Sequence, residues 1–159
     1  MIGAPRRHDG DLGRAWIALT LTLAAHVADE ALTDFLSVYN PLVLSARERF
    51  GWFPMPTFTF GIWLAGLIVA VVFLMLLTPL AYRRATAVRL AAFPYAAIML
   101  LNGIGHLAAS VYFGRWMPGA TTAPLLLAAS IWLFFAARKA GAAGPSKLGP
   151  YDGVTGGLL

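Results

Sequence analysis

Residues 63–74 read WLAGLIVAVVFL, a stretch with no polar interruption. This stretch lies inside a longer apolar segment, and about 20 such residues are enough for a helix to cross the ~30 Å hydrocarbon core of a bilayer. Three further segments have a similar length and composition. We therefore predict an all-α fold, a bundle of four transmembrane helices. The predicted spans are 15–38, 58–82, 90–113 and 121–137.

The composition of the whole chain also indicates a membrane protein. Of its 159 residues, 59% are hydrophobic and only 12% are charged, whereas soluble domains carry about 25% charged residues. The net charge of +5 comes from basic residues that flank apolar segments, and this pattern does not favour nucleic-acid binding. The chain has no cysteine, which excludes disulfides, thiolate metal sites and cysteine nucleophiles. No motif indicates a nucleotide cofactor or haem.

The basic residues predict an orientation. Nine of them lie on the side of the two termini and three on the other side, so the positive-inside rule predicts cytoplasmic termini. We expect residues 1–14 to be a cytoplasmic tail, 15–137 a four-span domain in a bacterial inner membrane, and 138–159 a disordered cytoplasmic tail. The nine are Arg6, Arg7, Arg14, Arg83, Arg84, Arg89, Arg138, Lys139 and Lys147; the three are Arg47, Arg49 and Arg115.

Two features of the first half refine this topology. The stretch 41–50 mixes aliphatic with charged residues, which predicts a short interfacial helix between the first two spans. Arginines precede the apolar run 15–25, so cleavage of the first span as a signal peptide near Ala25 or Ala28 stays an alternative. We favour a retained span because apolar residues resume downstream and no well-formed cleavage site is present.

Ionisable residues interrupt the first predicted span. His26, Asp29 and Glu30 have i, i+3, i+4 spacing and so share one face of a helix, with Asp34 at its edge. A charged side chain at the bilayer centre costs roughly 2.5–3.5 kcal/mol on insertion scales. No Lys or Arg occurs within residues 15–46. Protons, histidine, water or a metal ion must therefore balance the carboxylates.

The third predicted span carries Asn102 and His106 on one face. Both spans run from the inside to the outside, and counting at 1.5 Å per residue places His106 at the depth of Asp29 and Glu30. We therefore expect a buried polar site between the first and third spans. Alone, His106 or Asn102 could simply join two helices by a hydrogen bond. The acidic cluster is harder to explain as packing.

Three short motifs in these segments resemble the HXXEE family of small multi-pass membrane proteins. The segment 26–30, HVADE, is similar to the family signature, although Asp29 stands where the family has Glu. The segment 102–107, NGIGHL, resembles the family's N-x-x-x-H-L element. Tyr112 followed by 118–123, PGATTA, resembles its outer Y…PG…TA turn. The resemblance implies a multi-pass fold and a polar site, but the family has no established activity.

The site suggests a metal-dependent membrane enzyme. His26, Asp29, Glu30 and His106 offer nitrogen and oxygen ligands suited to Fe, Mn or Zn, and four-helix bundles commonly hold such ions in their cores. The small number of carboxylates favours one divalent ion rather than two. Glu30 and His26 are the candidate catalytic residues, and the expected substrate is lipidic or a small apolar molecule. Further polar residues of the predicted site are Asn102 and Asp34.

Other functions stay open at this point. Buried carboxylates with histidine as base could carry out metal-free acid/base chemistry, such as isomerisation of a lipid double bond. The same residues could serve a proton- or cation-coupled transporter or channel subunit, which with four spans would require a homodimer. A structural or accessory protein is a further alternative. Membrane lipids are the expected partners in each case.

Overall fold

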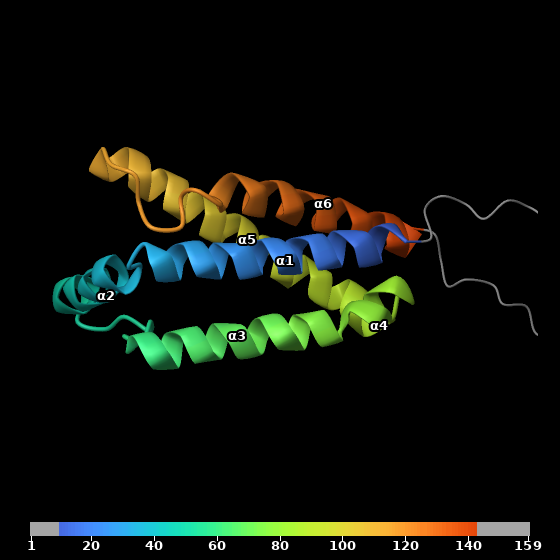
Figure 1. Ribbon diagram of the computed structural model, residues 1–159, viewed down its shortest axis with the longest axis horizontal. Helices are drawn as coiled ribbons and strands as arrows, with labels where there is room; N and C mark the ends of the chain where they lie inside the picture. The colour runs from blue at the N-terminus through green and yellow to red at the C-terminus, as the bar shows by residue number, and fades with distance from the viewer. Residues whose placement is uncertain (1–9, 143–159) are drawn as a thin grey trace, which may run out of the picture.

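The computed structural model describes residues 10–142, and over that range its regular structure is entirely helical. Four stretches are long and apolar enough to cross a membrane, namely α1, the α3–α4 stretch, α5 and α6 (Figure 1). The predicted all-α bundle of four spans is therefore confirmed, and it is consistent with an integral membrane protein. The helices are α1 (Asp11–Leu32), α2 (Leu36–Phe50), α3 (Phe60–Leu76), α4 (Thr78–Tyr82), α5 (Thr86–Phe113) and α6 (Ala123–Ala142).

The central helix of the bundle is α1. It lies between α6 and α3 in Figure 1 and packs against both, while α5 packs mainly against α6. Leu19 of α1 and Leu126 and Ala137 of α6 are fully buried in the core that these helices share. Trp16 of α1 donates a hydrogen bond from Nε1 to the carbonyl oxygen of Leu74, 2.8 Å away on α3. This bond links α1 to α3 within the bundle.

The first span ends before the predicted limit of 38. Helix α1 stops at Leu32, and α2 begins after a three-residue turn. Asp34 in this turn has a φ of 57°, a left-handed conformation that Asp adopts more readily than most residues. Thr33 Oγ1 donates to the carbonyl of Asp29 at 2.6 Å. Such side-chain bonds compete with helix continuation, so the chain turns here despite the apolar residues that follow.

Helix α2 contains the predicted interfacial helix 41–50 and lies at one end of the bundle (Figure 1). The amide of Asn40 pairs with the backbone of Phe58: Nδ2 donates to the carbonyl at 2.9 Å, and the Phe58 N–H donates to Oδ1 at 3.1 Å. Arg47 donates to the carbonyl of Met55 at 2.6 Å. These bonds hold the segment before α3 against α2.

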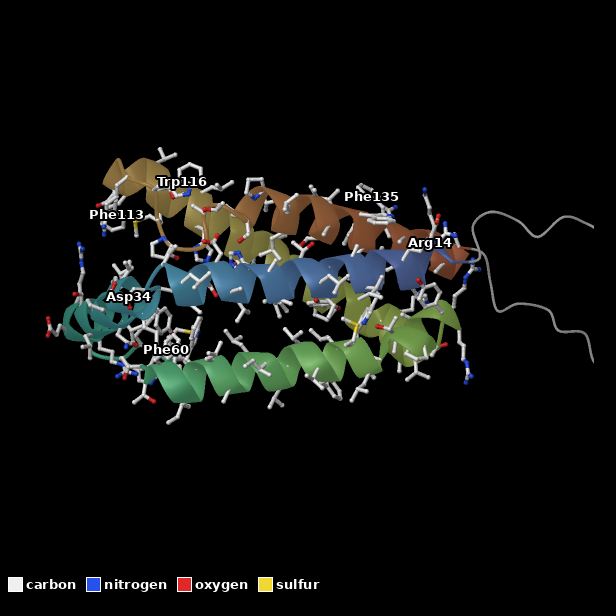
Figure 2. The ribbon with its side chains drawn as sticks, in the orientation of Figure 1. Arg14, Asp34, Phe60, Phe113, Trp116 and Phe135 are labelled. Atoms are coloured by element: carbon white, nitrogen blue, oxygen red, sulfur yellow. The ribbon has the colours of Figure 1, made fainter. Side chains whose placement is uncertain are left out.

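The two ends of the described chain lie at the opposite end of the bundle from α2 (Figure 1). Figure 2 shows Arg14 at this end and Asp34 at the α2 end, with mostly apolar side chains between them. Helix α6 continues five residues past the predicted limit of 137. The rest of the predicted tails, residues 1–9 and 143–159, lie outside the described residues.

The loop 114–122 joins α5 to α6 and folds back into the bundle at the α2 end. Its residues Met117 and Ala120 are buried. Ser110 of α5 accepts a hydrogen bond from the Met117 N–H at 3.1 Å. The loop therefore covers the end of the bundle and brings its backbone to the face of α1 that carries the polar cluster.

Candidate functional site

Three of the predicted site residues converge at the α2 end of the bundle. His26 and Glu30 lie one turn apart on α1, and His106 on α5 faces them. Each offers one ligand atom, and these atoms lie within 4.8 Å of one another. Glu30 Oε1 is 3.0 Å from His106 Nε2 and 3.6 Å from His26 Nε2. The three residues are only 1–8% exposed. Glu30 and His106 therefore lie at the same level of the helix bundle.

Gly119 lets the loop approach both imidazoles. A Cβ atom at this position would lie 2.7 Å from His106 Nδ1 and 3.0 Å from His26 Cε1. The backbone φ of +80° at Gly119 is also a conformation that favours glycine. The two rings meet edge to face, with centroids 4.8 Å apart. Glycine is therefore required here both by the available space and by the backbone.

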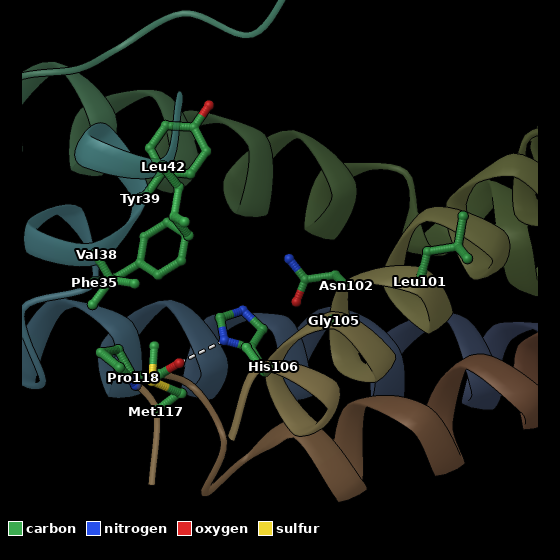
Figure 3. A pocket seen from close by; sticks show the side chains of 11 residues that line it. Phe35, Val38, Tyr39, Leu42, Leu101, Asn102, Gly105, His106, Met117 and Pro118 are labelled. Atoms are coloured by element: carbon green, nitrogen blue, oxygen red, sulfur yellow. Dashed lines mark hydrogen bonds between the residues drawn. The ribbon is translucent and has the colours of Figure 1, made fainter. Parts of the chain in front are cut away.

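A backbone carbonyl fixes the orientation of His106. Its Nδ1 lies 2.5 Å from the carbonyl oxygen of Pro118 (Figure 3). A carbonyl oxygen only accepts hydrogen bonds, so Nδ1 must carry a hydrogen. In the neutral ring, Nε2 is then the nitrogen with the free lone pair, and it faces Glu30. Metal-bound histidines usually donate their second ring N–H in this way.

Asp29 and Thr122 fix the orientation of His26. Thr122 donates to Asp29 Oδ2 from its backbone N–H at 3.1 Å and from Oγ1 at 3.0 Å. The carbonyl of Gly119 is a more distant acceptor for this hydroxyl, at 3.3 Å. Because the hydroxyl donates its one hydrogen to the carboxylate, Oγ1 accepts from His26 Nδ1, 2.7 Å away. His26 Nε2 therefore carries the free lone pair of the neutral ring.

Both imidazoles thus direct an Nε2 lone pair toward the carboxylate of Glu30. The two Nε2 atoms and the Glu30 oxygen are all hydrogen-bond acceptors and cannot bond to one another, so a proton or a metal ion is needed between them. His26 Nε2 is buried and has no hydrogen-bond partner. Donors on a tetrahedral zinc ion lie about 3.3 Å apart, given Zn–N bonds of ~2.0–2.1 Å. The separations of 3.0 and 3.6 Å from Glu30 Oε1 are close to this value, while the three ligand atoms together span up to 4.8 Å, so the two imidazoles would move closer together to hold such an ion.

Two cavities border this cluster. The larger has a volume of about 380 Å³, and its lining includes Glu30 and Asn102. The smaller has a volume of about 210 Å³, and its lining includes His106 and again Asn102 (Figure 3). Phe35 and Tyr39 contribute to both linings. The polar cluster is therefore reached from two sides by largely apolar space.

Tyr39 lines both cavities at the α2 end. Its hydroxyl donates to the carbonyl of Pro56 at 2.9 Å. Burial raises the pKa of the Tyr39 phenol above its ordinary value, against an opposing effect of Arg47. The phenol is therefore neutral at physiological pH and keeps this hydrogen bond, which holds the wall of the cavities in position.

The other predicted site residues occupy different positions. Asp34 is exposed in the turn between α1 and α2. Asp29 is half-buried and binds Thr122 rather than joining the three converging groups. Asn102 lies on α5 with its side chain next to the ring of His26, and its Oδ1 is buried. Of the four predicted ligands, His26, Glu30 and His106 form a cluster. Asp29 instead binds Thr122, which contacts His26.

Sequence reasoning did not assign Pro118, Gly119 or Thr122 to the site. It treated the PGATTA segment only as a turn that resembles a family motif. The sequence contained a usable signal, because Thr122 directly precedes α6 and lies in the loop at the α2 end of the bundle. Asp29 has no basic partner on its helix, so polar groups of the nearest loop were candidates to bind it.

Comparison with known proteins identifies one matching family. A family model described as a protein of unknown function with HXXEE motif matches residues 16–133, a range that includes the whole site. Neither a curated protein nor a solved structure matches the chain. In the motif, His26 and Glu30 are the two positions that converge, while Asp29 occupies the first acidic position and binds the loop.

Proposed function

The chain belongs to the HXXEE family, whose function is unknown, and we propose that it is a membrane enzyme that uses one divalent metal ion. The substrate is lipidic or a small apolar molecule. His26, Glu30 and His106 are the proposed ligands, and the ion is Fe²⁺, Mn²⁺ or Zn²⁺. One observation carries the proposal: two Nε2 lone pairs meet one buried carboxylate, and an ion would offset its charge. When bound, such an ion supplies Lewis acidity.

The number of ligands favours a catalytic rather than a structural site. Structural zinc sites usually have four protein ligands, whereas catalytic sites have three and leave one position open. Here the cluster contains three ligand residues, and two of them also line cavities. The larger cavity, at about 380 Å³, falls within the range of small-molecule sites. A substrate in that cavity would therefore meet the open side of the cluster.

The two histidines and Glu30 have different proposed roles at the site. His26 and His106 are held in one tautomer by Thr122 and by the carbonyl of Pro118, so their Nε2 atoms are the ring nitrogens available to bind the ion. Glu30 lines the larger cavity as well as the cluster. Its carboxylate is therefore the group that can accept or hold a proton next to a bound substrate.

We propose cytoplasmic termini in a bacterial inner membrane, with the site toward the outer face. The support is the distribution of basic residues. Within the described range, six lie on the side of the chain ends and three on the side of α2 and the 114–122 loop. The six are Arg14, Arg83, Arg84, Arg89, Arg138 and Lys139; the three are Arg47, Arg49 and Arg115.

Elemental analysis of the detergent-purified protein tests the proposal. We expect near-stoichiometric Fe, Mn or Zn in the wild type and its loss in Glu30→Gln and His106→Ala. Asp34→Asn is the matched control for Glu30→Gln, because it makes the same acid-to-amide change at an exposed turn. Asn also tolerates the positive φ of that position. A wild-type protein that holds no metal even after reconstitution would contradict the proposal.

Metal-free acid/base chemistry on a lipid is the second candidate. It is favoured by the distance of 3.0 Å between Glu30 Oε1 and His106 Nε2, at which one proton can be shared between an acid and a base. This candidate predicts a protein without metal in which Glu30→Gln and His106→Ala still bind lipid but no longer turn it over. The metal content of the wild type therefore separates the two candidates.

A further inference from the structure

A groove lies between α5 and α6 and shares no residue with the cavities beside the His–Glu cluster. Its volume is about 190 Å³, and its lining is apolar except for Ser130. The hydroxyl of Ser130 donates its one hydrogen to the carbonyl of Leu126 on the same helix, at 2.7 Å. Ala96 and Ala97 form part of the α5 side of the groove, and their small side chains leave the space open. The groove therefore suits a hydrocarbon chain rather than a polar group.

The two helix faces that form this groove each continue to an arginine. Arg89 precedes Ala96 by seven residues on α5, and Arg138 follows Ile131 by seven residues on α6. Residues at this spacing lie on the same face of a helix, about 10 Å apart along its axis. The guanidinium of Arg89 also lies against the last turn of α6, because a Cβ atom at Gly141 would be 2.6 Å from its Nη1. Both arginines therefore lie at the same end of the groove.

Positive charge prevails at this end of the bundle. Within the described range, six basic residues lie here and Asp11 is the one acidic residue. Among the same residues, neither Arg89 nor Arg138 forms an ion pair with a carboxylate. Figure 2 shows Phe135, which lines the groove, toward this end, where Arg14 also lies. An anion next to the groove would therefore meet basic side chains with little competition from carboxylates.

We propose that the groove between α5 and α6 binds one phospholipid with an anionic head group. Its phosphate lies between Arg89 and Arg138, and one acyl chain lies along Ala96, Ala97 and Ile131. The order of charge and hydrocarbon along the two helices matches that of a lipid in a bilayer. A zwitterionic lipid fits less well, because its ammonium group would lie near the same arginines. The proposed lipid site goes beyond the proposed function and does not depend on a metal ion.

Native mass spectrometry of the full-length protein tests the lipid site, because it resolves each bound lipid by its mass. The probes are phosphatidylglycerol and phosphatidylcholine with identical acyl chains, added to delipidated protein in detergent. We expect the first phosphatidylglycerol to bind about 5- to 25-fold more tightly than phosphatidylcholine, since each basic residue near an anionic lipid contributes about fivefold. Equal affinity of the wild type for the two lipids would overturn the proposal.

Substitutions of the arginines test the position of the head group. Arg89→Gln and Arg138→Gln should each reduce the preference for phosphatidylglycerol about fivefold, whereas Arg89→Lys keeps the charge and should retain most of it. Arg83→Gln is the matched control. Arg83 lies at the same end but directly follows α4, which lies on the opposite side of α1 from α6 in Figure 1. An equal loss in Arg83→Gln would assign the preference to the overall charge of this end and overturn the site.

A substitution in the groove tests the position of the acyl chain. Ala97→Phe should fill the groove and weaken the binding of both lipids. Ala91→Phe is the control, because it makes the same change at an exposed position of α5 outside the lining. Thermal unfolding in detergent verifies that each variant is folded. Wild-type lipid binding by Ala97→Phe would overturn the proposal.

Two other occupants of the groove give different results in the same spectra. Glycerol phosphate that binds as tightly as the whole lipid would mean that the arginines bind a free phosphate group and that the groove contributes nothing. A protein dimer that dissociates in Ala97→Phe would mean that a second copy of the chain fills the groove. Either result would overturn the lipid site, whereas a monomer that binds only the whole lipid supports it.

Discussion

The hydroxyl of Thr122 lies 3.0 Å from Asp29 Oδ2 and 2.7 Å from His26 Nδ1, and so it connects the carboxylate to the imidazole. Since the carboxylate takes the hydroxyl hydrogen, His26 must donate from Nδ1, and its Nε2 is left free to bind. A residue of the loop thereby selects the tautomer of a histidine on α1. The site therefore depends on the loop as well as on the two helices.

Replacing Thr122 with Val keeps the shape of the side chain and removes this connection. The buried N–H of His26 then loses its acceptor, which should lower the free energy of unfolding by about 1–3 kcal/mol. If the site holds metal, its affinity should fall about 10- to 100-fold, as with other partners of metal-bound histidines. Thermal unfolding and metal titration in detergent measure the two effects.

The neighbouring Thr121 supplies the control for this substitution. Its hydroxyl accepts only an exposed bond from Trp116 at 3.1 Å, so Thr121→Val should cost less than about 1 kcal/mol and leave metal affinity unchanged. Thr122→Ser should restore most of the wild-type behaviour because it returns the hydroxyl. Equal effects of the two valine substitutions would mean that Thr122 does not support His26.

Gly119→Ala should be more damaging than the same change at Gly114. Both glycines have positive φ, +80° and +60°, so alanine causes backbone strain at each position. Only at Gly119 would the new Cβ meet other atoms, those of His106 and His26, at 2.7 and 3.0 Å. We expect Gly119→Ala to lower the free energy of unfolding by about 1–3 kcal/mol more than Gly114→Ala does.

Chemical denaturation of both glycine variants in the same detergent measures this difference. Because the strain is common to the two positions, subtraction isolates the cost of crowding the imidazoles. Two variants of equal stability would show that the loop can move away from the histidines, and the close approach of Gly119 would then have no structural importance.

Part of this architecture could be predicted because it depends on local patterns. Apolar length indicates a span, and the spacing of His26 and Glu30 puts them on one face of α1. The shared depth with His106 follows from counting residues along two parallel spans. The contact between Thr122 and Asp29 joins residues 93 positions apart. No local pattern sets the path of an irregular loop, so this contact could not be predicted.

The end of the first span shows the same limit at a smaller scale. Phe35 and Leu36 continue the apolar pattern of α1, which is why the predicted span extends to 38. The structure ends the helix at Leu32 because Thr33 and Asp34 form a turn through side-chain bonds and a left-handed backbone. Hydropathy measures only whether a residue prefers lipid, so it does not detect a turn of this kind.

Metal affinity should decrease as the pH is lowered. Both imidazoles must be neutral and the carboxylate ionised to bind an ion, so protons compete with metal for the same three groups. We therefore expect tighter binding of Zn²⁺ near pH 8 than near pH 5.5, with protons released on binding. Titration calorimetry in two buffers of different ionisation enthalpy measures that release. Affinity that does not depend on pH would argue against histidine ligands.

The adjacent acids Asp29 and Glu30 should respond differently to the same chemical change. Asp29→Asn keeps one accepting oxygen, and Thr122 can still donate to it from both its N–H and its hydroxyl. We expect this variant to retain metal, with a loss of affinity of tenfold or less. Glu30→Gln replaces the carboxylate on which both Nε2 atoms converge, and it should lose the metal.

Comparing these two variants assigns the two acidic positions of the motif. Elemental analysis reports occupancy, and thermal unfolding reports whether each protein is folded. If Asp29→Asn also loses the metal while remaining folded, Asp29 is a ligand and the loop contact breaks when the ion binds. If only Glu30→Gln loses it, the first acid positions the loop and the second holds the ion. The shorter side chain of Asp29 then matters for its reach to Thr122 rather than for its reach to a metal.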